Sequence, residues 1–343
     1  MMFMNPYSLI LWLRHKRYDW RICNSVQMDI PTLSIGNITV GGTGKTPHTE
    51  LILRLFSQEI PIAVLSRGYK RTSKGFRYVT LNDTVADVGD EPLQIKRKFP
   101  NLVVAVDKNR ISGINRMVHD HPQMKWIVLD DAFQYRKLIP SYSILLSNYH
   151  RPFTQDHLLP FGQLRDLPSQ SKRADMIIVT KTPPEVSQQE REHQMKLLRP
   201  QLHQQLLFSR YTYSNPIPLF PHFAGMAPLP HSSTTVLVVT GIAHPEPFII
   251  EIEKQKLIIQ HLKFPDHHNF TQKDILRIDA LSIKYPGIPI YTTEKDAMRL
   301  LERSSLCREV KSVLFYISVQ VIFCTEKEKH HFIETLRKFQ FVV

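Results

Sequence analysis

The residues from 39 to 46, Thr-Val-Gly-Gly-Thr-Gly-Lys-Thr, are of the types that hold the phosphates of a nucleoside triphosphate. A largely apolar run precedes them at 31–38, and an apolar-periodic segment follows at 51–56. This is the order of strand, glycine-rich loop and helix that a phosphate-binding loop requires. The glycines let backbone N–H groups close around phosphate oxygens, and the helix N-terminus adds the positive end of its dipole. The spacing therefore predicts a nucleotide-binding loop.

Each side chain of this loop has an expected task. Lys45 is placed to bridge the β- and γ-phosphates, and the Thr46 hydroxyl to ligate Mg²⁺. The usual pattern, G-x-x-x-x-G-K-[ST], has glycine where this chain has Thr39, so a glycine-rich helix entry that binds nothing is one alternative. The loop of partitioning ATPases is another, but it requires a lysine where this chain has Val40. The residues expected to bind the nucleotide are Thr39, Val40, Gly41, Gly42, Thr43, Gly44, Lys45 and Thr46.

A second group of residues could hold a metal ion. The run 125–131, Lys-Trp-Ile-Val-Leu-Asp-Asp, predicts a strand that ends in two carboxylates, Asp130 and Asp131. A carboxylate at such a strand tip holds Mg²⁺ opposite a phosphate loop. Because adjacent side chains of a strand point to opposite faces, the two carboxylates have different tasks unless the chain turns there. A surface turn after a buried strand is the alternative.

Further charged residues follow predicted strands or begin predicted helices. Asp90 and Glu91 lie at an expected helix start, where capping would explain them, but Asp90 is also a candidate base for an attacking hydroxyl. Arg67 and Arg110 could neutralise charge on a transferred phosphoryl group or form structural ion pairs. The run 264–270, Phe-Pro-Asp-His-His-Asn-Phe, could supply a histidine that tunes an acid or base, or be an ordinary polar loop.

Short apolar runs alternate with helix-length segments, and these elements must position the charged groups. The rhythm predicts βαβ units, and hence an α/β fold with a doubly wound, mostly parallel sheet like that of phosphate-loop NTPases. Prolines interrupt the pattern between 211 and 233, after which a second, smaller α/β domain is expected. The predicted divisions are an N-terminal helix in 1–30, a phosphate-loop domain in 31–210, a linker in 211–233 and the smaller domain in 234–343.

Composition narrows the partners. The chain of 343 residues carries a net charge of +13, which favours anionic partners such as acidic lipid surfaces or phosphorylated substrates. It has no zinc-finger spacing, aromatic RNA-binding motif or arginine-rich arm, so nucleic acid is not an expected partner. The three scattered cysteines indicate neither a disulfide framework nor a metal cluster.

The N-terminal region predicts contact with an anionic membrane surface. The apolar block 7–13 is followed at once by clustered cations and by Trp20. No apolar run approaches the roughly 18 residues of a membrane span. Apolar residues, tryptophans and cations together are typical of a helix lying in the membrane interface, and a helix packed on the sheet with a solvated basic end is the alternative. The cations are Arg14, Lys16, Arg17 and Arg21.

The order and spacing of several motifs resemble one family, the tetraacyldisaccharide 4'-kinases, which are the lipid A 4'-kinases. The resemblance covers most of the chain, and the absence of the first loop glycine is also typical of the family. The motifs lie at 36–47, 65–69, 88–92, 129–134, 159–166, 172–175, 264–267 and 291–296.

The resemblance implies transfer of the γ-phosphate of ATP, with Mg²⁺, to the 4'-hydroxyl of an acylated glucosamine disaccharide 1-phosphate, a step of lipid A biosynthesis. It implies a peripheral protein at the cytoplasmic face of the inner membrane, with no obligate protein partner expected. The catalytic residues it implies are Asp90 as the base, His267 assisting it, Arg110 steadying a phosphate, Lys45, and Gln134 in the active cleft. The metal ligands it implies are Thr46, Asp130 and Asp131.

This chain departs from the family pattern at three positions. Ala132 replaces a common glycine, Tyr135 replaces a histidine, and Asp166 stands where glutamate is frequent. Two other function classes stay open at this point. One is a regulatory phosphate-loop ATPase of the partitioning type, and the other is a peripheral membrane-binding module with a vestigial nucleotide site.

Overall fold

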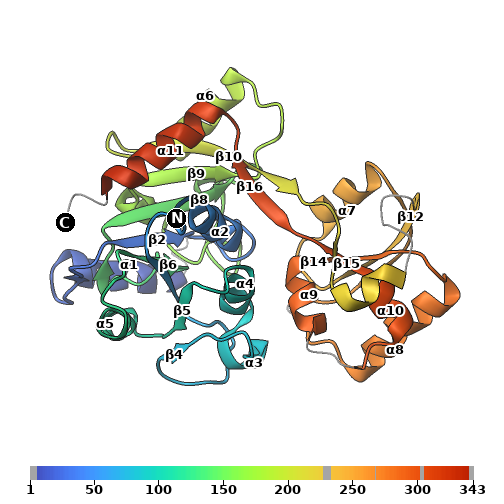
Figure 1. The fold of residues 1–343 in the computed structure, drawn as a ribbon. Helices are drawn as coiled ribbons and strands as arrows, with labels where there is room; N and C mark the ends of the chain where they lie inside the picture. Colours follow the sequence, from blue (N-terminus) through green and yellow to red (C-terminus); the bar gives the residue numbers. More distant parts are fainter. Residues whose placement is uncertain (1–5, 227–232, 267, 302–304, 340–343) are drawn as a thin grey trace. The chain divides into compact units, whose positions relative to one another are not determined.

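The computed structural model describes residues 6–226, 233–266, 268–301 and 305–339, which fold into two compact units (Figure 1). The first unit runs to Tyr211 and takes up the chain again at Val321, and the second is Thr212–Gln320. Each unit is built on its own sheet with its own apolar core.

The first unit is built on a nine-stranded sheet in the order β16-β10-β9-β8-β2-β6-β3-β5-β4. The pairs from β10 to β5 are parallel, and β4 is antiparallel to β5. The strands are β2 (Thr32–Gly36), β3 (Ile62–Ser66), β4 (Arg77–Tyr78), β5 (Val103–Val106), β6 (Trp126–Asp130), β8 (Tyr142–Asn148), β9 (Met176–Thr180), β10 (Gln205–Tyr213) and β16 (Val319–Phe323).

Helices cover both faces of this sheet, so its central strands are buried throughout. Residues of α2, α4 and α11 share one core cluster with alternate strand residues such as Val64 and Val128. The intervening residues, such as Leu65 and Leu129, pack with α5 on the other face. Burial on both faces explains why these strands are nearly continuous apolar runs. The elements are α1 (Pro6–Asp19), α2 (Lys45–Phe56), α3 (Val85–Val88), α4 (Asp90–Lys98), α5 (Arg110–Asp120), α6 (Gln188–Leu198), α11 (Glu326–Phe339), and the 3-10 turns Phe153–Gln155 and Pro168–Arg173.

Strand β1 (Val26–Gln27), which follows α1, pairs in parallel with β7 (Leu138–Ile139), which follows β6, and the two form a separate two-stranded sheet. The second unit has a five-stranded sheet in the order β11-β15-β14-β12-β13, parallel except for β11. Its strands are β11 (Ile217–Pro218), β12 (Thr235–Thr240), β13 (Leu257–Lys263), β14 (Ile290–Thr293) and β15 (Leu314–Ile317). Its helices are α7 (Glu246–Glu253), α8 (Gln272–Lys284), α9 (Glu294–Leu301), α10 (Arg308–Val313) and the 3-10 turn Pro221–Met226.

The end of the chain corrects the expected extent of the second domain, 234–343. Strand β16 joins the large sheet beside β10, and α11 packs into the core of the first unit. The ring of Phe339 lies 5.0 Å from that of Trp126 in β6. The expected linker, 211–233, also begins with ordered strand, because β10 continues to Tyr213 and β11 pairs with β15. The local alternation of apolar runs does not indicate which sheet a strand near the end of the chain joins. For this reason the predicted end of the second domain differs from the observed one.

Candidate active site at the phosphate loop

The predicted phosphate loop joins β2 to α2, at the carboxyl edge of the central strands. Gly41 and Gly44 have φ angles of +89° and +88°, a conformation that L side chains rarely adopt. Helix α2 begins at Lys45, directly after Gly44, so its free N–H groups face the loop. The structure thus places the loop at the start of a helix, as a phosphate cradle requires.

The side chain of Asn37, which the sequence did not single out, organises this loop from within. Its amide nitrogen donates to the hydroxyls of Thr43 (2.6 Å) and Thr39 (3.3 Å) and to the carbonyl of Gly41 (3.4 Å). The N–H of Val40 is held by the carbonyl of Gln163 at 2.7 Å. In the common pattern a glycine stands at the position of Thr39. In this chain, the contacts of Asn37 and Gln163 hold the loop at that position.

The two predicted metal ligands lie beside the loop. Asp130 ends β6 and is buried, with the hydroxyls of Thr49 and Ser66 each 3.4 Å from its carboxylate. Asp131 has a φ of +49°, so the chain turns there and both carboxylates face the loop side. The Lys45 ammonium lies 3.8 Å from Asp131. The turn removes the conflict that two adjacent strand residues would otherwise present.

The Arg165 guanidinium clamps Asp131 with two hydrogen bonds, one of them 3.1 Å long. The same guanidinium donates to the side-chain oxygen of Asn37 at 2.5 Å. Arg165 thereby ties Asp131 to Asn37, the residue that organises the loop. It lies in the motif at 159–166, but the sequence assigned it no role because nothing local shows that it meets residues 37 and 131.

Burial and neighbouring charges shift the pKa values of Asp130, Asp131 and Lys45 in different directions. Burial raises the pKa of Asp130 to about 6, and the neighbouring charges of Asp131 and Glu91 act in the same direction. Burial would also raise the pKa of Asp131, but the charges of Lys45 and Arg165 outweigh it and hold that pKa below its usual value. Burial lowers the pKa of Lys45. A divalent cation beside these oxygens would stabilise the charged form of both carboxylates.

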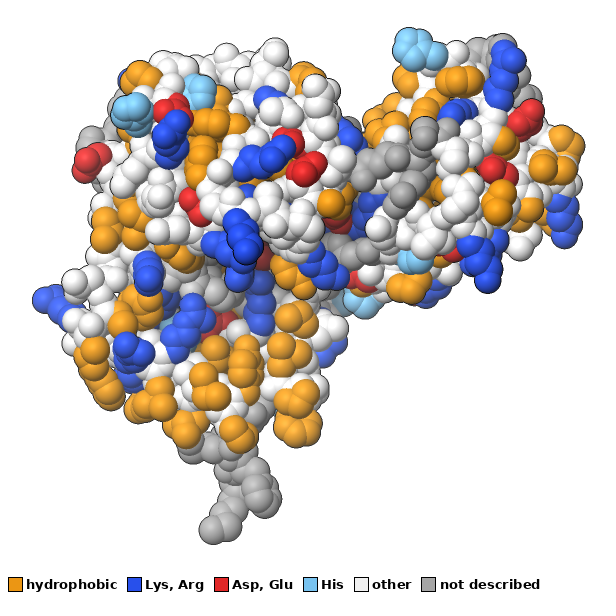
Figure 2. All heavy atoms as spheres, turned by 90° about the horizontal axis from the view of Figure 1, so that it is seen from below, with side chains coloured by type: hydrophobic (Ala, Val, Ile, Leu, Met, Phe, Trp, Pro, Cys, Tyr) orange, Lys and Arg blue, Asp and Glu red, His pale blue; other side chains and the backbone are white. Residues whose placement is uncertain are grey.

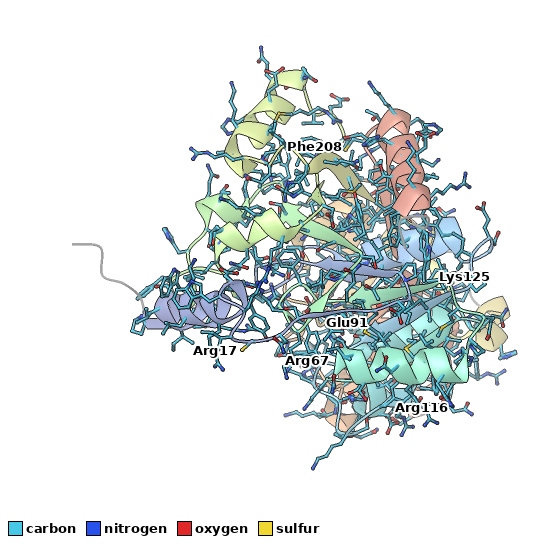
Figure 3. The ribbon with its side chains drawn as sticks, turned by 90° about the vertical axis from the view of Figure 1, so that its left-hand side faces the viewer. Arg17, Arg67, Glu91, Arg116, Lys125 and Phe208 are labelled. Atoms are coloured by element: carbon cyan, nitrogen blue, oxygen red, sulfur yellow. The ribbon has the colours of Figure 1, made fainter. Side chains whose placement is uncertain are left out.

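Arg110 and the acidic start of α4 complete the surroundings. Arg110 begins α5, is 2% exposed and donates to the carbonyl of Asp107 at 2.6 Å. Burial lowers its pKa, while the charges of Asp130 and Asp131 act against that shift. Asp90 is buried at the first position of α4, and Glu91, labelled in Figure 3, acts electrostatically on Lys45. The structure therefore brings Arg110 within electrostatic range of both aspartates.

Gln134 contacts the loop rather than standing apart from it. Its side-chain amide donates to the carbonyl of Asn37 at 2.7 Å. The neighbouring Tyr135, which replaces the family histidine, donates its hydroxyl to Asn109 at 3.1 Å, and Asn109 caps α5. Tyr135 thus supports the helix that carries Arg110.

Lys181 is a third residue that sequence reasoning missed. It follows β9 with a φ of +57°, and burial lowers its pKa. Its ammonium lies 3.8 Å from the position that a Cβ on Gly42 would occupy. A cation at this distance from the loop is placed to meet a bound phosphate. The only local signal is that it follows an apolar strand, as many surface lysines do.

The histidine run in the second unit gives a mixed result. His267 lies outside the described residues, so its assisting role stays a prediction. Its neighbour His268 is bonded to Asp274 at 2.9 Å and stacks on Phe264 with ring centroids 4.8 Å apart. His268 is therefore accounted for by packing within its own unit.

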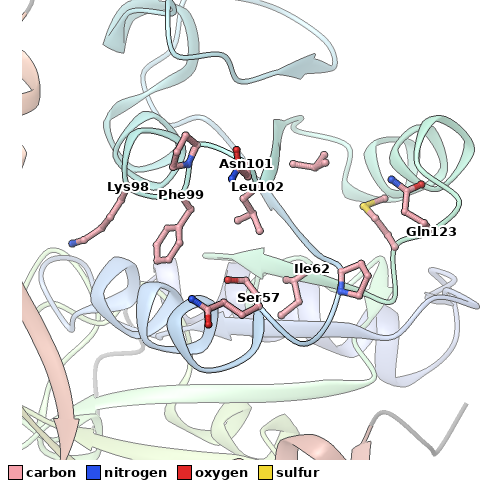
Figure 4. Close-up of a pocket in the computed structure, with 12 residues that line it drawn as sticks. Ser57, Ile62, Lys98, Phe99, Asn101, Leu102 and Gln123 are labelled. Atoms are coloured by element: carbon pink, nitrogen blue, oxygen red, sulfur yellow. The ribbon is translucent and has the colours of Figure 1, made fainter.

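A pocket of about 400 Å³ lies away from this site, near the amino ends of β3 and β5 (Figure 4). Ser57, Ile62, Phe99 and Leu102 are among the residues that line it. None of the predicted site residues is among those that line it.

The fold and the loop together define an α/β phosphate-loop protein that handles a nucleoside triphosphate beside a carboxylate pair. The model of the Tetraacyldisaccharide-1-P 4'-kinase family matches residues 1–338. The chain therefore belongs to the tetraacyldisaccharide 4'-kinase family. It is a kinase of lipid A biosynthesis, and the predicted family, fold class and enzyme class are confirmed. Membership of a kinase family sets aside the partitioning-type ATPase and the vestigial membrane module.

Several known proteins are similar to this chain over nearly its whole length. The tetraacyldisaccharide 4'-kinase of Parabacteroides distasonis is 42% identical, with 95% of this chain and 91% of the relative covered. That of Phocaeicola vulgatus is 40% identical, with 94% and 90% covered. A crystal structure of "apo" form LpxK from Aquifex aeolicus in complex with ATP matches with a TM-score of 0.72 at 22% identity, covering 97% of this chain and 96% of that one. At that identity the structural likeness shows the fold.

Proposed function

We propose that this chain transfers the γ-phosphate of ATP to the 4'-hydroxyl of tetraacyldisaccharide 1-phosphate, giving the 1,4'-bisphosphate lipid. The acceptor follows from the name of the family, and ATP from the bound nucleotide in the Aquifex aeolicus structure. The observation that carries the proposal is the meeting of Lys45 with Asp131 at the edge of the loop, beside the buried Asp130. A triphosphate and a metal ion both find their ligand types there.

The residues at the loop fit Mg²⁺. Thr46, Asp130 and Asp131 supply hydroxyl and carboxylate oxygens, which are the ligands that this ion prefers. Bound with ATP, the ion would neutralise charge on the β- and γ-phosphates. Burial and the charges of Asp131 and Glu91 raise the pKa of Asp130 despite the opposing charges of Lys45 and Arg110, and a bound cation would favour its charged form.

The protein's own residues would supply alignment, positive charge and a proton acceptor. Lys45 binds the transferring phosphate, and the guanidinium of Arg110 stabilises the negative charge that develops on it. A sugar hydroxyl is a weak nucleophile near neutral pH, so a carboxylate must accept its proton as the bond to phosphorus forms. We assign that task to Asp90, with His267 assisting it, and we assign to Gln134 the placement of Asn37 in the loop.

We also propose that α1 brings the enzyme to the cytoplasmic face of the inner membrane. Leu9, Ile10 and Leu13 on this helix are exposed, whereas Leu11 and His15 are buried against the unit. Thus one side of the helix packs against the unit, and the exposed apolar side chains on its other side support this proposal. Figure 2 shows hydrophobic side chains gathered on this face of the molecule. Among the described residues, no helix has both the length and the apolar character to cross a bilayer.

The direct experiment incubates the purified protein with ATP, Mg²⁺ and tetraacyldisaccharide 1-phosphate in detergent micelles. Mass spectrometry should detect a product heavier by one phosphoryl group, with the new phosphate at the 4' position. The acceptor without its 4'-hydroxyl serves as the control and should give no product. Hydrolysis of ATP at the same rate with and without the acceptor, and no phosphorylated lipid, would contradict the proposal.

A further inference from the structure

Helix α1 is connected to the phosphate loop by a short chain of hydrogen bonds. The Arg14 guanidinium donates to the backbone carbonyl of Gln134 at 2.7 Å. The side-chain amide of Gln134 donates to the carbonyl of Asn37 at 2.7 Å, and Asn37 in turn donates to the Thr43 hydroxyl at 2.6 Å. Three bonds thus lead from the N-terminal helix into the nucleotide site.

A second connection from α1 reaches the same place. The Tyr7 hydroxyl donates to the backbone carbonyl of Arg165 at 3.0 Å. His15 is bonded to the next residue, Asp166, at 2.5 Å, and both side chains are buried. Arg165 is the residue that holds Asn37 and Asp131 together. Both connections therefore end on Asn37, which shapes the loop.

We propose that Arg14 is a positioning residue for the phosphate loop, so that the placement of helix α1 sets the affinity of the nucleotide site. The inference rests on the proposed function for its choice of nucleotide. Its physical basis is that the loop has Thr39 where the common pattern has glycine and depends on Asn37, whose carbonyl Gln134 holds. Arg14 holds the backbone of Gln134 from outside.

The test measures ATP binding in the presence of Mg²⁺ and in the absence of any lipid, by calorimetry. Arg14→Ala is expected to weaken ATP binding by about threefold to tenfold, with the full energy of a hydrogen bond from a charged donor as the upper limit, because the exposed Arg14 bond acts on the loop through Gln134 and Asn37. Arg14→Lys keeps a cationic donor and should recover most of the affinity. Arg17→Ala is the matched control, because Arg17 is an exposed arginine of the same helix (Figure 3). It should leave the affinity for ATP unchanged.

Two further measurements separate positioning from general destabilisation. In a double-mutant cycle, the effects of Arg14→Ala and Gln134→Ala on ATP affinity should not add, since both break one chain of contacts. If Arg14→Ala does not fold, Arg14→Met, which keeps the aliphatic stem without the donor, carries the same expectation.

Certain results would overturn the inference. Parental ATP affinity in Arg14→Ala, an equal loss in Arg17→Ala, or additive effects in the cycle would each do so. Failure of the proposed function is a separate result. A parent protein that binds ATP but leaves the lipid acceptor unphosphorylated would contradict the acceptor assignment, while the difference between Arg14→Ala and Arg17→Ala would still test the role of α1.

Discussion

Each unit of this protein contains an aspartate–arginine pair at the end of a parallel strand, and the two pairs differ in what surrounds them. In the second unit, Asp296 and Arg299 are 0% and 6% exposed. The Asp296 carboxylate also accepts from the N–H of Gly241 at 2.8 Å and from the Thr293 hydroxyl at 2.7 Å. In the first unit, Asp131 and Arg165 are 30% and 25% exposed.

The difference distinguishes a structural ion pair from one at a functional site. The bonds of Asp296 connect β12, β14 and α9 within one core, and protein groups satisfy them. Asp131 instead is partly exposed and shares its surroundings with Lys45 and with the second carboxylate of Asp130. Charged groups that lie close together and remain accessible are those that a ligand can reach.

The strongest test of this comparison removes the cation of the open site. Lys45→Ala should lower turnover on the order of 1000-fold, since a positive charge held against the transferring phosphate contributes several kcal/mol to the stability of the transition state. Initial rates at saturating acceptor measure it. The melting temperature should stay near that of the parent, because Lys45 holds no core together. A near-normal rate would contradict the assignment of the phosphate loop.

The closed pair predicts the opposite outcome. Asp296→Ala should remove the carboxylate that balances the buried charge of Arg299 and lower the free energy of unfolding by about 3 kcal/mol. Thermal unfolding followed by circular dichroism measures the loss. A variant that melts like the parent would show that the pair of the second unit is not a structural one.

The proposed base gives a smaller effect, confined to chemistry. Asp90→Asn should reduce turnover at least about 100-fold, because the acceptor hydroxyl loses its proton acceptor. Binding of ATP should be largely intact, and calorimetry checks this on the same preparation. Unchanged turnover would remove Asp90 from the role of base.

The smallest expected effect concerns stability against pH. Burial raises the pKa of Asp130 to about 6, so the folded protein disfavours its charged form. The free energy of unfolding should then fall as pH rises from about 4 to about 6, because the unfolded state ionises first. Asp130→Asn removes this cost, on the order of 2 kcal/mol without metal or nucleotide. It should melt above the parent at pH 7.5 and close to it at pH 4.5. An equal difference at both pH values would contradict this account.

Much of the site could be predicted because its patterns are short. The loop at 39–46 and the pair Asp130 and Asp131 each lie within a few residues after an apolar run, so the local order of strand, turn and helix indicates their chemistry. The carboxyl ends of parallel strands meet at one edge, which brings the two patterns together without further information.

The residues that sequence reasoning missed depend on distant contacts. Arg165 meets Asn37 and Asp131 across separations of 128 and 34 residues, and no spacing rule connects them. Lys181 reaches the loop only because β9 lies two strands from β2 in the sheet. The return of β16 and α11 to the first unit is a choice between two sheets that share the same local apolar pattern.

The amino-acid sequence by itself determined the alternation of strands and helices, the phosphate loop and the acidic strand tip, because backbone propensities and burial act over a few residues. Tertiary structure alone decided which side chains support them. Arg14, Gln134, Asn37 and Arg165 become neighbours only when separate segments pack. The reason is physical: a hydrogen bond is set by distance in space, and the chain brings these groups within reach only after its sheet has formed.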